Sequence, residues 1–347
     1  MTDNAAEPRT TIRMTDYDYE LPDDLIAQEP VEPRDASRLL VADRRSREIE
    51  DRKFSDLPEL LDPGDLVVLN DTRVRHARLH ARRSTGGRVE LLILDEVADA
   101  EWTALARPAR RLRDGELLSL ETASDVVIQV QRDEGPVVRV SGISSEAVER
   151  YGAIPLPPYI DRELSDEERY QTIVASALGS AAAPTAGLHF TPVLLDRLRE
   201  RDIGIETVTL HVGLDTFRPV TVEAAENHEI HSEWYRIPGS AAKAIDRTRR
   251  QGNRVVAVGT TVVRTLETGV RETGPGQPSE GWSTLYITPP FEFQLVDSMI
   301  TNFHLPRTTL LLLVSAFMGR EFMFEAYEHA ITKQYRFYSF GDAMIIL

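Results

Sequence analysis

The chain has 347 residues, no cysteine and a formal net charge of −16. A chain of this length buries a full hydrophobic core and favours two domains, and its ordinary apolar and charged fractions exclude a disordered or fibrous protein. The lack of cysteine excludes disulfides, thiolate metal sites and cysteine nucleophiles and fits a reducing compartment, while the negative charge argues against indiscriminate binding of nucleic acid.

The N-terminal segment 1–14, MTDNAAEPRTTIRM, contains no apolar stretch of the kind found in a signal peptide. The most apolar run of the chain, TLLLLVSAFMG at 309–319, is too short to cross a bilayer as a helix. We therefore expect a cytoplasmic protein with no membrane contact.

Short β-rich runs separated by turn signals fill the region between residues 65 and 142. The turns are PGD, TGG, RDG and DEGP, and short strands at this spacing are typical of a small antiparallel β-barrel. The runs are DLVVLN, ARLHARR, GRVELLIL, WTALAR, ELLSLE, VVIQVQ and VVRVSG. The segment YGAIPLPPYI at 151–160 follows, and we interpret it as a crossover between domains because proline is excluded from helix interiors and central strands.

The barrel region carries two clusters of arginine. The first, at 73–88, contains no acidic residue, and the second is RPARRLR at 107–113. Because salt screens charges beyond about 8 Å, a local basic patch is able to bind phosphates on an acidic protein; the alternative is a set of solvated strand faces. The arginines that we expect to contact an RNA backbone are Arg73, Arg75, Arg78, Arg82, Arg110 and Arg111.

Helix and strand patterns alternate after residue 160. A helix is predicted from Pro192 to near Gly204, a strand at 205–213, a second helix at 241–253, a strand at 254–258 and a third helix from 259. This alternation indicates an α/β layer with a mostly parallel sheet, in which ligands bind beyond the carboxyl ends of the strands.

Two histidines fall close to such positions. In IETVTLHVG, His211 shares the polar strand face with two threonines and precedes Gly213 at the predicted strand end. In SAAAPTAGLHFTP, at 180–192, small residues precede His189, which stands just before a helix start. His189 is interpreted either as a hydrogen-bonded histidine of a tight turn or as part of a pocket with thin walls.

Further polar groups interrupt the apolar segment VDSMITNFHLP. Asp297, Asn302 and His304 are interpreted either as groups directed into a cavity or as a buried hydrogen-bond network. His228, His231 and Glu233 in NHEIHSEWY match no familiar zinc spacing, so no metal site is expected. The chain also lacks a G-x-G-x-x-G sequence after a strand and a P-loop, so neither a dinucleotide fold nor a P-loop enzyme is supported.

Taken together, these segments resemble the S-adenosylmethionine:tRNA ribosyltransferase-isomerase family of queuosine biosynthesis nearly end to end. The matching motifs include YDYELPDDLIAQEP, PGDLVVLNDTRVRHARL, LPPYIDR, RYQTIVA, AAPTAGLHF, TLHVG, HSEWY, VVAVGTTVVRTLE, VDSMITNFHLP and YRFYSFGDAM, in this order. Two positions depart from the family pattern: Asp215 stands where a small residue is usual, and Pro290 stands where glycine is frequent. Both departures concern loop geometry.

The resemblance implies a discontinuous α/β domain, residues 1–64 and 151–347, with a β-barrel inserted at 65–150. It implies transfer and isomerisation of the ribosyl group of S-adenosylmethionine onto 7-aminomethyl-7-deazaguanine at the wobble position of tRNA, giving epoxyqueuosine, adenine and methionine. S-adenosylmethionine is then a co-substrate, and no metal, redox cofactor or obligate protein partner is expected. The sulfonium acidifies the neighbouring C5′ hydrogen, so the protein must supply a base, a proton donor for adenine and a stabiliser of the cation.

We assign these tasks to particular residues from their predicted positions, His189 before a helix start and His211 on a polar strand face, and from the chemistry of the cation for Asp297. Catalytic roles are expected for His189 as base, His211 as proton donor and Asp297 as a partner of the cation. Substrate-binding residues are expected to be Thr185, Gly187, Gly213, Thr260, Thr261, Arg264, Asn302 and His304. Thr260 and Thr261 are alternatively simple helix caps. Two other classes stay open: a non-catalytic tRNA-binding protein with a basic barrel, and an α/β enzyme that acts on a nucleoside without RNA.

Overall fold

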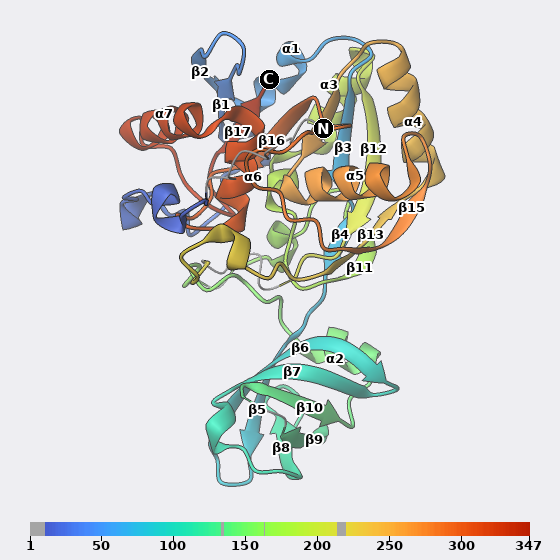
Figure 1. Cartoon of the computed structure of the whole chain (residues 1–347). Helices are drawn as coiled ribbons and strands as arrows, with labels where there is room; N and C mark the ends of the chain where they lie inside the picture. Colours follow the sequence, from blue (N-terminus) through green and yellow to red (C-terminus); the bar gives the residue numbers. More distant parts are fainter. Residues whose placement is uncertain (1–10, 133–134, 163, 214–219) are drawn as a thin grey trace, which may run out of the picture.

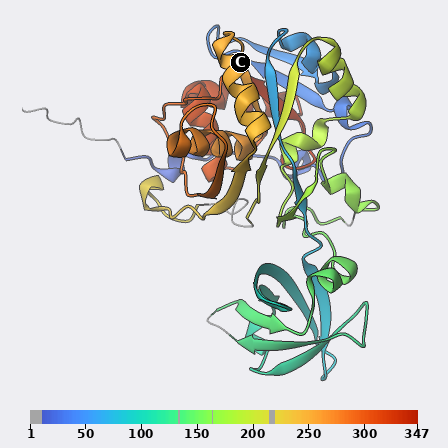
Figure 2. The same cartoon turned by 90° about the vertical axis from the view of Figure 1, so that its right-hand side faces the viewer.

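The structure is a computed structural model that describes residues 11–132, 135–162, 164–213 and 220–347. Asp215 therefore lies outside the described residues. A large α/β domain and a small β-barrel stand apart from each other in both views (Figures 1 and 2). This arrangement confirms the expected α/β fold class with an inserted barrel.

A nine-stranded sheet forms the centre of the α/β domain. Its strands, from one edge to the other, are β15 (Ser279–Ser283), β13 (Glu233–Ile237), β12 (Gly204–Leu210), β3 (Leu66–Asn70), β14 (Val255–Val258), β16 (Ser298–Asn302), β17 (Ala343–Ile346), β1 (Arg38–Ala42) and β2 (Ile49–Lys53). Strands β12, β3, β14 and β16 run parallel, and β17 runs parallel to β1. The antiparallel pairs lie at β15–β13–β12, β16–β17 and β1–β2.

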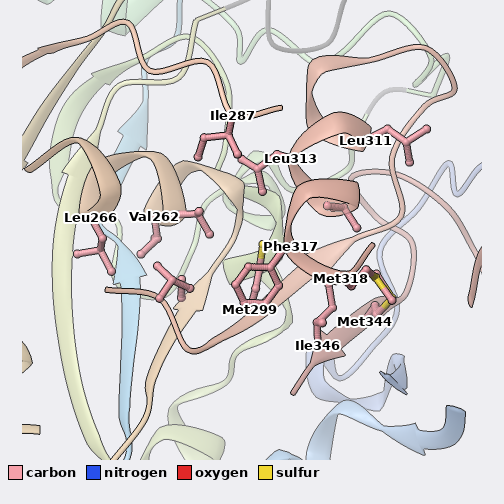
Figure 3. Close-up of a cluster of buried hydrophobic side chains, with 14 of the residues drawn as sticks. Val262, Leu266, Ile287, Met299, Leu311, Leu313, Phe317, Met318, Met344 and Ile346 are labelled. Atoms are coloured by element: carbon pink, nitrogen blue, oxygen red, sulfur yellow. The ribbon is translucent and has the colours of Figure 1, made fainter. Parts of the chain in front are cut away.

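Helices cover both faces of this sheet. One face packs against α4 (Gly239–Arg250), α5 (Thr260–Thr273), α6 (Thr309–Met318) and α7 (Arg320–Thr332). The other face packs against α1 (Leu57–Leu60) and α3 (Pro192–Glu200). Figure 3 shows the first core, in which side chains of α5 and α6 meet those of β16 and β17, among them Val262, Leu266, Met299, Leu313, Phe317 and Met344.

The placement of Leu66–Asn70 in the barrel was wrong. This strand, β3, lies in the middle of the nine-stranded sheet, between β12 and β14. All five of its residues are buried, whereas the barrel strand β5 (Arg78–Arg83) alternates between buried and more exposed positions. The physical reason is that a central parallel strand is covered on both faces and is apolar throughout, while a barrel strand is apolar on one face only.

Six antiparallel strands close the barrel in the order β10-β7-β6-β5-β8-β9. Besides β5 they are β6 (Arg88–Ala98), β7 (Glu101–Arg107), β8 (Glu116–Leu120), β9 (Val127–Arg132) and β10 (Val137–Ser141), followed by α2 (Ser145–Tyr151). Closure leaves no free sheet edge, and alternate side chains around Trp102 fill the interior. A short parallel pair, β4 (Thr72–Val74) with β11 (Ala177–Ser180), lies in the chain just before the barrel and after the proline-rich segment.

Within the part of the chain that the structure describes, no helix has both the length and the apolar character needed to cross a membrane.

Candidate functional site

A pocket lies beyond the carboxyl ends of β14 and β16, the position expected for a ligand site in a parallel sheet. Its empty volume is about 600 Å³, which includes space open to solvent. The lining comes from six segments and contains Tyr159, Ala183, Pro184, Thr185, Ala186, Val212, Gly259, Thr260, Thr261, Thr301, Asn302, Phe303, His304, Leu305, Thr308, Leu310, Tyr338 and Ser339. No carboxylate, lysine or arginine belongs to this lining.

Small residues form one wall of the pocket. Gly259 connects β14 to α5 with a φ of 91° and donates its amide hydrogen to the Ile300 carbonyl at 2.7 Å. A side chain at this φ is strained, so the turn requires glycine. A Cβ on Gly259 would lie 3.6 Å from the Cβ of Ala186, which shows how closely the two walls approach.

The first turn of α5 points its amide groups toward the pocket. Helix α5 begins at Thr260, and the Val262 and Val263 amides donate to the Gly259 carbonyl. The Thr260 and Thr261 amides have no backbone acceptor among the described residues and lie at the positive end of the helix dipole. The hydroxyl of Thr261 is buried and has no hydrogen-bond partner among the described residues. An anionic group would satisfy both the amides and this hydroxyl, so this end of the pocket is suited to a carboxylate.

His189 is connected to the pocket through Asn302. The Asn302 side-chain nitrogen donates to the Tyr338 carbonyl at 3.2 Å, which identifies it as the donor, and it also lies 3.2 Å from His189 Nε2. His189 Nε2 is therefore the acceptor, and Nδ1 carries the hydrogen and donates to Ser37 Oγ at 2.8 Å. On the other side, Thr185 Oγ1 donates to Asn302 Oδ1 at 2.8 Å.

This network places His189 behind the pocket wall rather than in the lining. The side chain is 5% exposed and its ring stacks on Phe54 at a centroid distance of 4.9 Å. Burial, with Arg336 and Arg34 nearby, lowers the pKa of His189 to about 3, so the imidazole is neutral near pH 7. Of the two interpretations drawn from the sequence, the hydrogen-bonded histidine of a tight turn describes this contact pattern better.

His304 is the histidine that lines the pocket. Its Nε2 lies 2.8 Å from Thr301 Oγ1, and its backbone is held by the Tyr19 and Tyr327 hydroxyls. Burial lowers the pKa of His304 to about 3. The site thus presents a neutral imidazole, which accepts a hydrogen bond without adding charge and becomes a cation if it accepts a proton.

Asp297, which we expected to be a partner of the cation, lies outside the lining of this pocket. It precedes β16, whereas the pocket lies beyond the other end of that strand. Its carboxylate accepts the Val255 amide at 2.9 Å, and its carbonyl accepts Arg44 Nη2 at 2.6 Å. Asp297 therefore joins the amino ends of β14 and β16.

His211 also lies outside the lining, although its neighbour Val212 belongs to it. His211 Nδ1 lies 2.8 Å from Thr72 Oγ1, and the ring stacks on Trp234 at 5.1 Å. Burial lowers the pKa of His211 and Arg75 lowers it further, which disfavours the protonated form that a proton donor needs. No contact between His211 and His189 occurs among the described residues.

Three other expected binding residues lie next to the pocket without lining it. Gly187 faces Thr172, since an added Cβ would lie 3.0 Å from Thr172 Cγ2. Gly213 donates its amide to Glu233 Oε1 at 2.8 Å, and Arg264 forms an ion pair with the same carboxylate. Thr185, Thr260, Thr261, Asn302 and His304 are the expected binding residues that the structure brings together.

Sequence reasoning missed two aromatic residues of the lining, Tyr159 and Tyr338. They lie in LPPYIDR and YRFYSFGDAM, two motifs that carried the family resemblance. Their presence in those motifs was the available signal, but neither segment has a periodicity that reveals which side chain faces a ligand.

The first arginine cluster is paired with glutamates from outside it. These ion pairs join Arg73 to Glu168, Arg75 to Glu149 at 3.6 Å and Arg82 to Glu121 at 3.0 Å. Arg78 instead donates to the Leu156 carbonyl at 3.0 Å. Arg110 and Arg111, in contrast, are exposed on a short 3₁₀ turn after β7, and no carboxylate among the described residues pairs with either.

No group of three or more histidine, aspartate or glutamate side chains suited to a metal ion occurs in the described ranges. His231 contacts Glu233 at 3.1 Å, and that carboxylate is already bound by Arg264. This cluster is therefore an ion-pair network around a buried carboxylate.

A pocket at the carboxyl ends of parallel strands, beside an inserted barrel, is typical of a two-domain α/β enzyme. The sequence profile of the family described as queuosine biosynthesis protein matches residues 14–346. The chain belongs to this family, and it is an enzyme of the transferase class.

Curated relatives span essentially the whole chain. The S-adenosylmethionine:tRNA ribosyltransferase-isomerase of Symbiobacterium thermophilum is 50% identical over 341 residues, covering 97% of this chain and 100% of the relative. The protein of the same name from Thermotoga maritima is 49% identical over 338 residues, with the same coverage of both chains. A crystal structure of S-adenosylmethionine tRNA ribosyltransferase from Thermotoga maritima aligns with a TM-score of 0.57 and 39% identity, over 96% of this chain and 100% of that one.

Proposed function

We propose that this enzyme is an S-adenosylmethionine:tRNA ribosyltransferase-isomerase of queuosine biosynthesis. It transfers the ribosyl group of S-adenosylmethionine onto 7-aminomethyl-7-deazaguanine at the wobble position of tRNA. The ribosyl group is isomerised in the process, and the products are epoxyqueuosine-tRNA, adenine and methionine. The proposal places the enzyme in the cytoplasm, with S-adenosylmethionine as co-substrate rather than as a resident cofactor.

The observation that supports this function most directly is the chemistry of the pocket in a chain of this family. A zwitterionic amino-acid group, a cation and a nucleoside must bind together, and the pocket combines a helix N-terminus, aromatic rings, small-residue walls and a neutral imidazole. We assign the methionyl carboxylate to Thr260 and Thr261 at the start of α5. The small-residue wall at Ala183, Ala186 and Gly259 then gives the adenosyl group access to backbone atoms.

His304 replaces His189 as our candidate for proton transfer. It lines the pocket and is neutral near pH 7, the form in which an imidazole accepts a proton such as the C5′ proton that the sulfonium acidifies. Burial at the same time lowers its pKa and makes it a weaker base than a free imidazole. His189 takes a positioning role: it orients the Asn302 amide, and Asn302 in turn accepts the Thr185 hydroxyl. The donor that protonates departing adenine is not assigned to a residue.

RNA binding is assigned to the barrel and to the groove between the domains. This groove is lined by Arg78, Arg107 and one carboxylate, Glu90, of the barrel, by the proline-rich segment 155–158 and by Ala182. Ala182 adjoins Ala183 of the pocket, so the groove and the pocket are neighbours in the structure.

The two alternative classes are less well supported. A non-catalytic tRNA-binding protein has no use for a pocket that combines a helix N-terminus with a buried neutral histidine. A nucleoside enzyme without RNA has no use for an inserted barrel with exposed arginines.

One assay separates these functions. The protein is incubated with labelled S-adenosylmethionine and with tRNA that carries 7-aminomethyl-7-deazaguanine, and adenine release is measured. We expect adenine release that depends on the modified tRNA, with unmodified tRNA as the matched control. Release without tRNA would support the nucleoside enzyme, and tRNA binding without release would support the non-catalytic protein.

A further inference from the structure

The backbone of Tyr338 adopts a conformation that a bulky side chain rarely takes. Its φ is 70°, in the left-handed region where a side chain of this size is strained. Hydrogen bonds fix the residue on both sides: its amide donates to the Phe303 carbonyl at 3.2 Å, and its carbonyl accepts the Asn302 amide at 3.2 Å and the Gly341 amide at 3.0 Å. Strain that is held in place next to a pocket points to a functional constraint on the side chain.

The ring of Tyr338 lies next to that of Tyr159, and both residues line the pocket. The ring centroids are 4.8 Å apart with an interplanar angle of 55°, so the two faces diverge. The Tyr159 hydroxyl shares a hydrogen bond of 2.7 Å with Ser339 Oγ, which fixes the second ring. Burial raises the pKa of Tyr338, so its phenol stays neutral and offers a π face rather than a negative charge.

A cation that enters this pocket finds no carboxylate in the lining. Aromatic faces attract cations through their quadrupole, and the attraction increases when the site is desolvated. No lysine or arginine of the described residues lies over the Tyr338 ring, whereas Tyr335, three positions earlier, is covered by Arg38 at 3.7 Å. The Tyr338 ring therefore offers the pocket a π face over which no cationic side chain of the described residues lies.

We propose that Tyr338, together with Tyr159, forms the binding surface for the sulfonium cation of S-adenosylmethionine. This proposal rests on the proposed function, because the sulfonium is the cation of that substrate. In this proposal the two tyrosines, rather than Asp297, are the partners of the cation. The proposal also gives a reason for the left-handed backbone of Tyr338, which directs an aromatic side chain toward a pocket whose lining has no carboxylate.

Substitutions at Tyr338 test this proposal. Tyr338→Asn removes the ring and keeps the backbone, because asparagine tolerates the left-handed region better than other residues. Tyr338→Phe keeps the ring and removes the hydroxyl. Titration calorimetry measures the affinity of each variant for S-adenosylmethionine and for S-adenosylhomocysteine, the uncharged thioether of nearly the same shape.

We expect Tyr338→Asn to lose about tenfold in affinity for S-adenosylmethionine and less than about twofold for the thioether. Tyr338→Phe should keep the affinity of the wild type for both ligands. Equal losses for the two ligands in Tyr338→Asn would overturn the proposal, because the ring would then contact the ribose or adenine. If Tyr338→Asn is poorly folded, Tyr159→Leu is titrated in the same way, and the same two outcomes decide.

The wild type separates this proposal from the proposed function. If the wild type shows no tRNA-dependent adenine release and binds neither ligand, the proposed function fails. If it releases adenine and prefers the sulfonium while Tyr338→Asn retains that preference, only the aromatic surface is refuted.

Discussion

The pocket of the α/β domain and the surface of the barrel differ in their content of charged side chains. The pocket lining has no charged side chain, and its histidine is kept neutral by burial. The barrel carries many arginines, and those of the first cluster that form ion pairs bind glutamates distant in sequence, such as Glu168 and Glu149.

This difference corresponds to two kinds of ligand. Oriented dipoles and π faces are able to bind a small cation in a buried pocket. They avoid the desolvation free energy that a buried carboxylate partner would cost. A polyanion on an open surface is attracted by exposed cations, and paired arginines contribute less because each already has a counter-charge. On the proposed function, we therefore expect the exposed Arg110 and Arg111, which have no carboxylate partner among the described residues, to contribute more to RNA binding than the paired arginines of the first cluster.

The largest effect is expected from the histidine that lines the pocket. His304→Asn should lower turnover by about a hundredfold or more, the usual scale for a proton-transfer group, while tRNA affinity stays unchanged. Turnover is measured by adenine release, and the proton step by solvent exchange of the C5′ hydrogens in the presence of tRNA. His80→Asn, at an exposed barrel position, is the matched control and should have no effect.

His189→Asn completes this test, because asparagine preserves the donor toward Ser37 and removes the acceptor for Asn302. We expect a smaller loss of turnover than in His304→Asn. A loss in His189→Asn as large as that in His304→Asn, with C5′ exchange abolished, would return the role of base to His189.

The next effect concerns the barrel. Replacing Arg110 and Arg111 by alanine should weaken tRNA binding about 30-fold at physiological salt and reduce the slope of log affinity against log salt by about 1.8, if each contacts one phosphate. The matched double variant, Arg82→Ala with Arg88→Ala, removes two arginines that share Glu121 and should change both quantities much less. Binding is measured by filter retention at several salt concentrations, and a larger effect in the control would place the RNA on the paired face.

At Thr261 we expect a smaller effect on binding and an opposite effect on stability. Its hydroxyl is buried without a described partner, so Thr261→Val should raise the free energy of unfolding by removing an unsatisfied polar group. The same change should weaken S-adenosylmethionine binding about tenfold, because a hydrogen bond to the carboxylate is lost. Thr273→Val, at the other end of α5, is the control for binding; unchanged affinity in Thr261→Val would remove the carboxylate from this helix end.

The last effect concerns stability rather than function and is a change in the pH dependence of the free energy of unfolding at His189. Burial lowers its pKa from 6.5 to about 3 in the folded protein, so between these values the unfolded chain binds a proton that the folded protein does not. The free energy of unfolding therefore falls as pH decreases from 6.5 toward about 3, by at most about 1.4 kcal/mol per pH unit from this residue. Urea unfolding of His189→Asn should show a shallower decrease in this window, and an unchanged pH dependence would mean that His189 is protonated in the folded state.

Several elements were predictable from local patterns. The alternation in ARLHARR and the turns TGG and RDG gave barrel strands close to the observed β5, β6 and β8, because a strand with one buried face has a period of two. The helix starts at Pro192 and Thr260 followed from proline and glycine at their usual positions. Leu66–Asn70 carried its own signal, an apolar run without alternation, which indicates burial on both faces.

By itself the sequence determined the family and the α/β and barrel classes, and it predicted a ligand site at strand ends such as Gly259, where the structure has a pocket. Only the tertiary structure decided which side chains reach that site. Asp297 and Asn302 belong to one short segment, yet they lie at opposite ends of β16. At about 3.3 Å per residue the strand separates them by roughly 16 Å. His189, Tyr338 and the paired arginines depend on contacts with residues far away in sequence, which pairing across the fold creates and local periodicity does not encode.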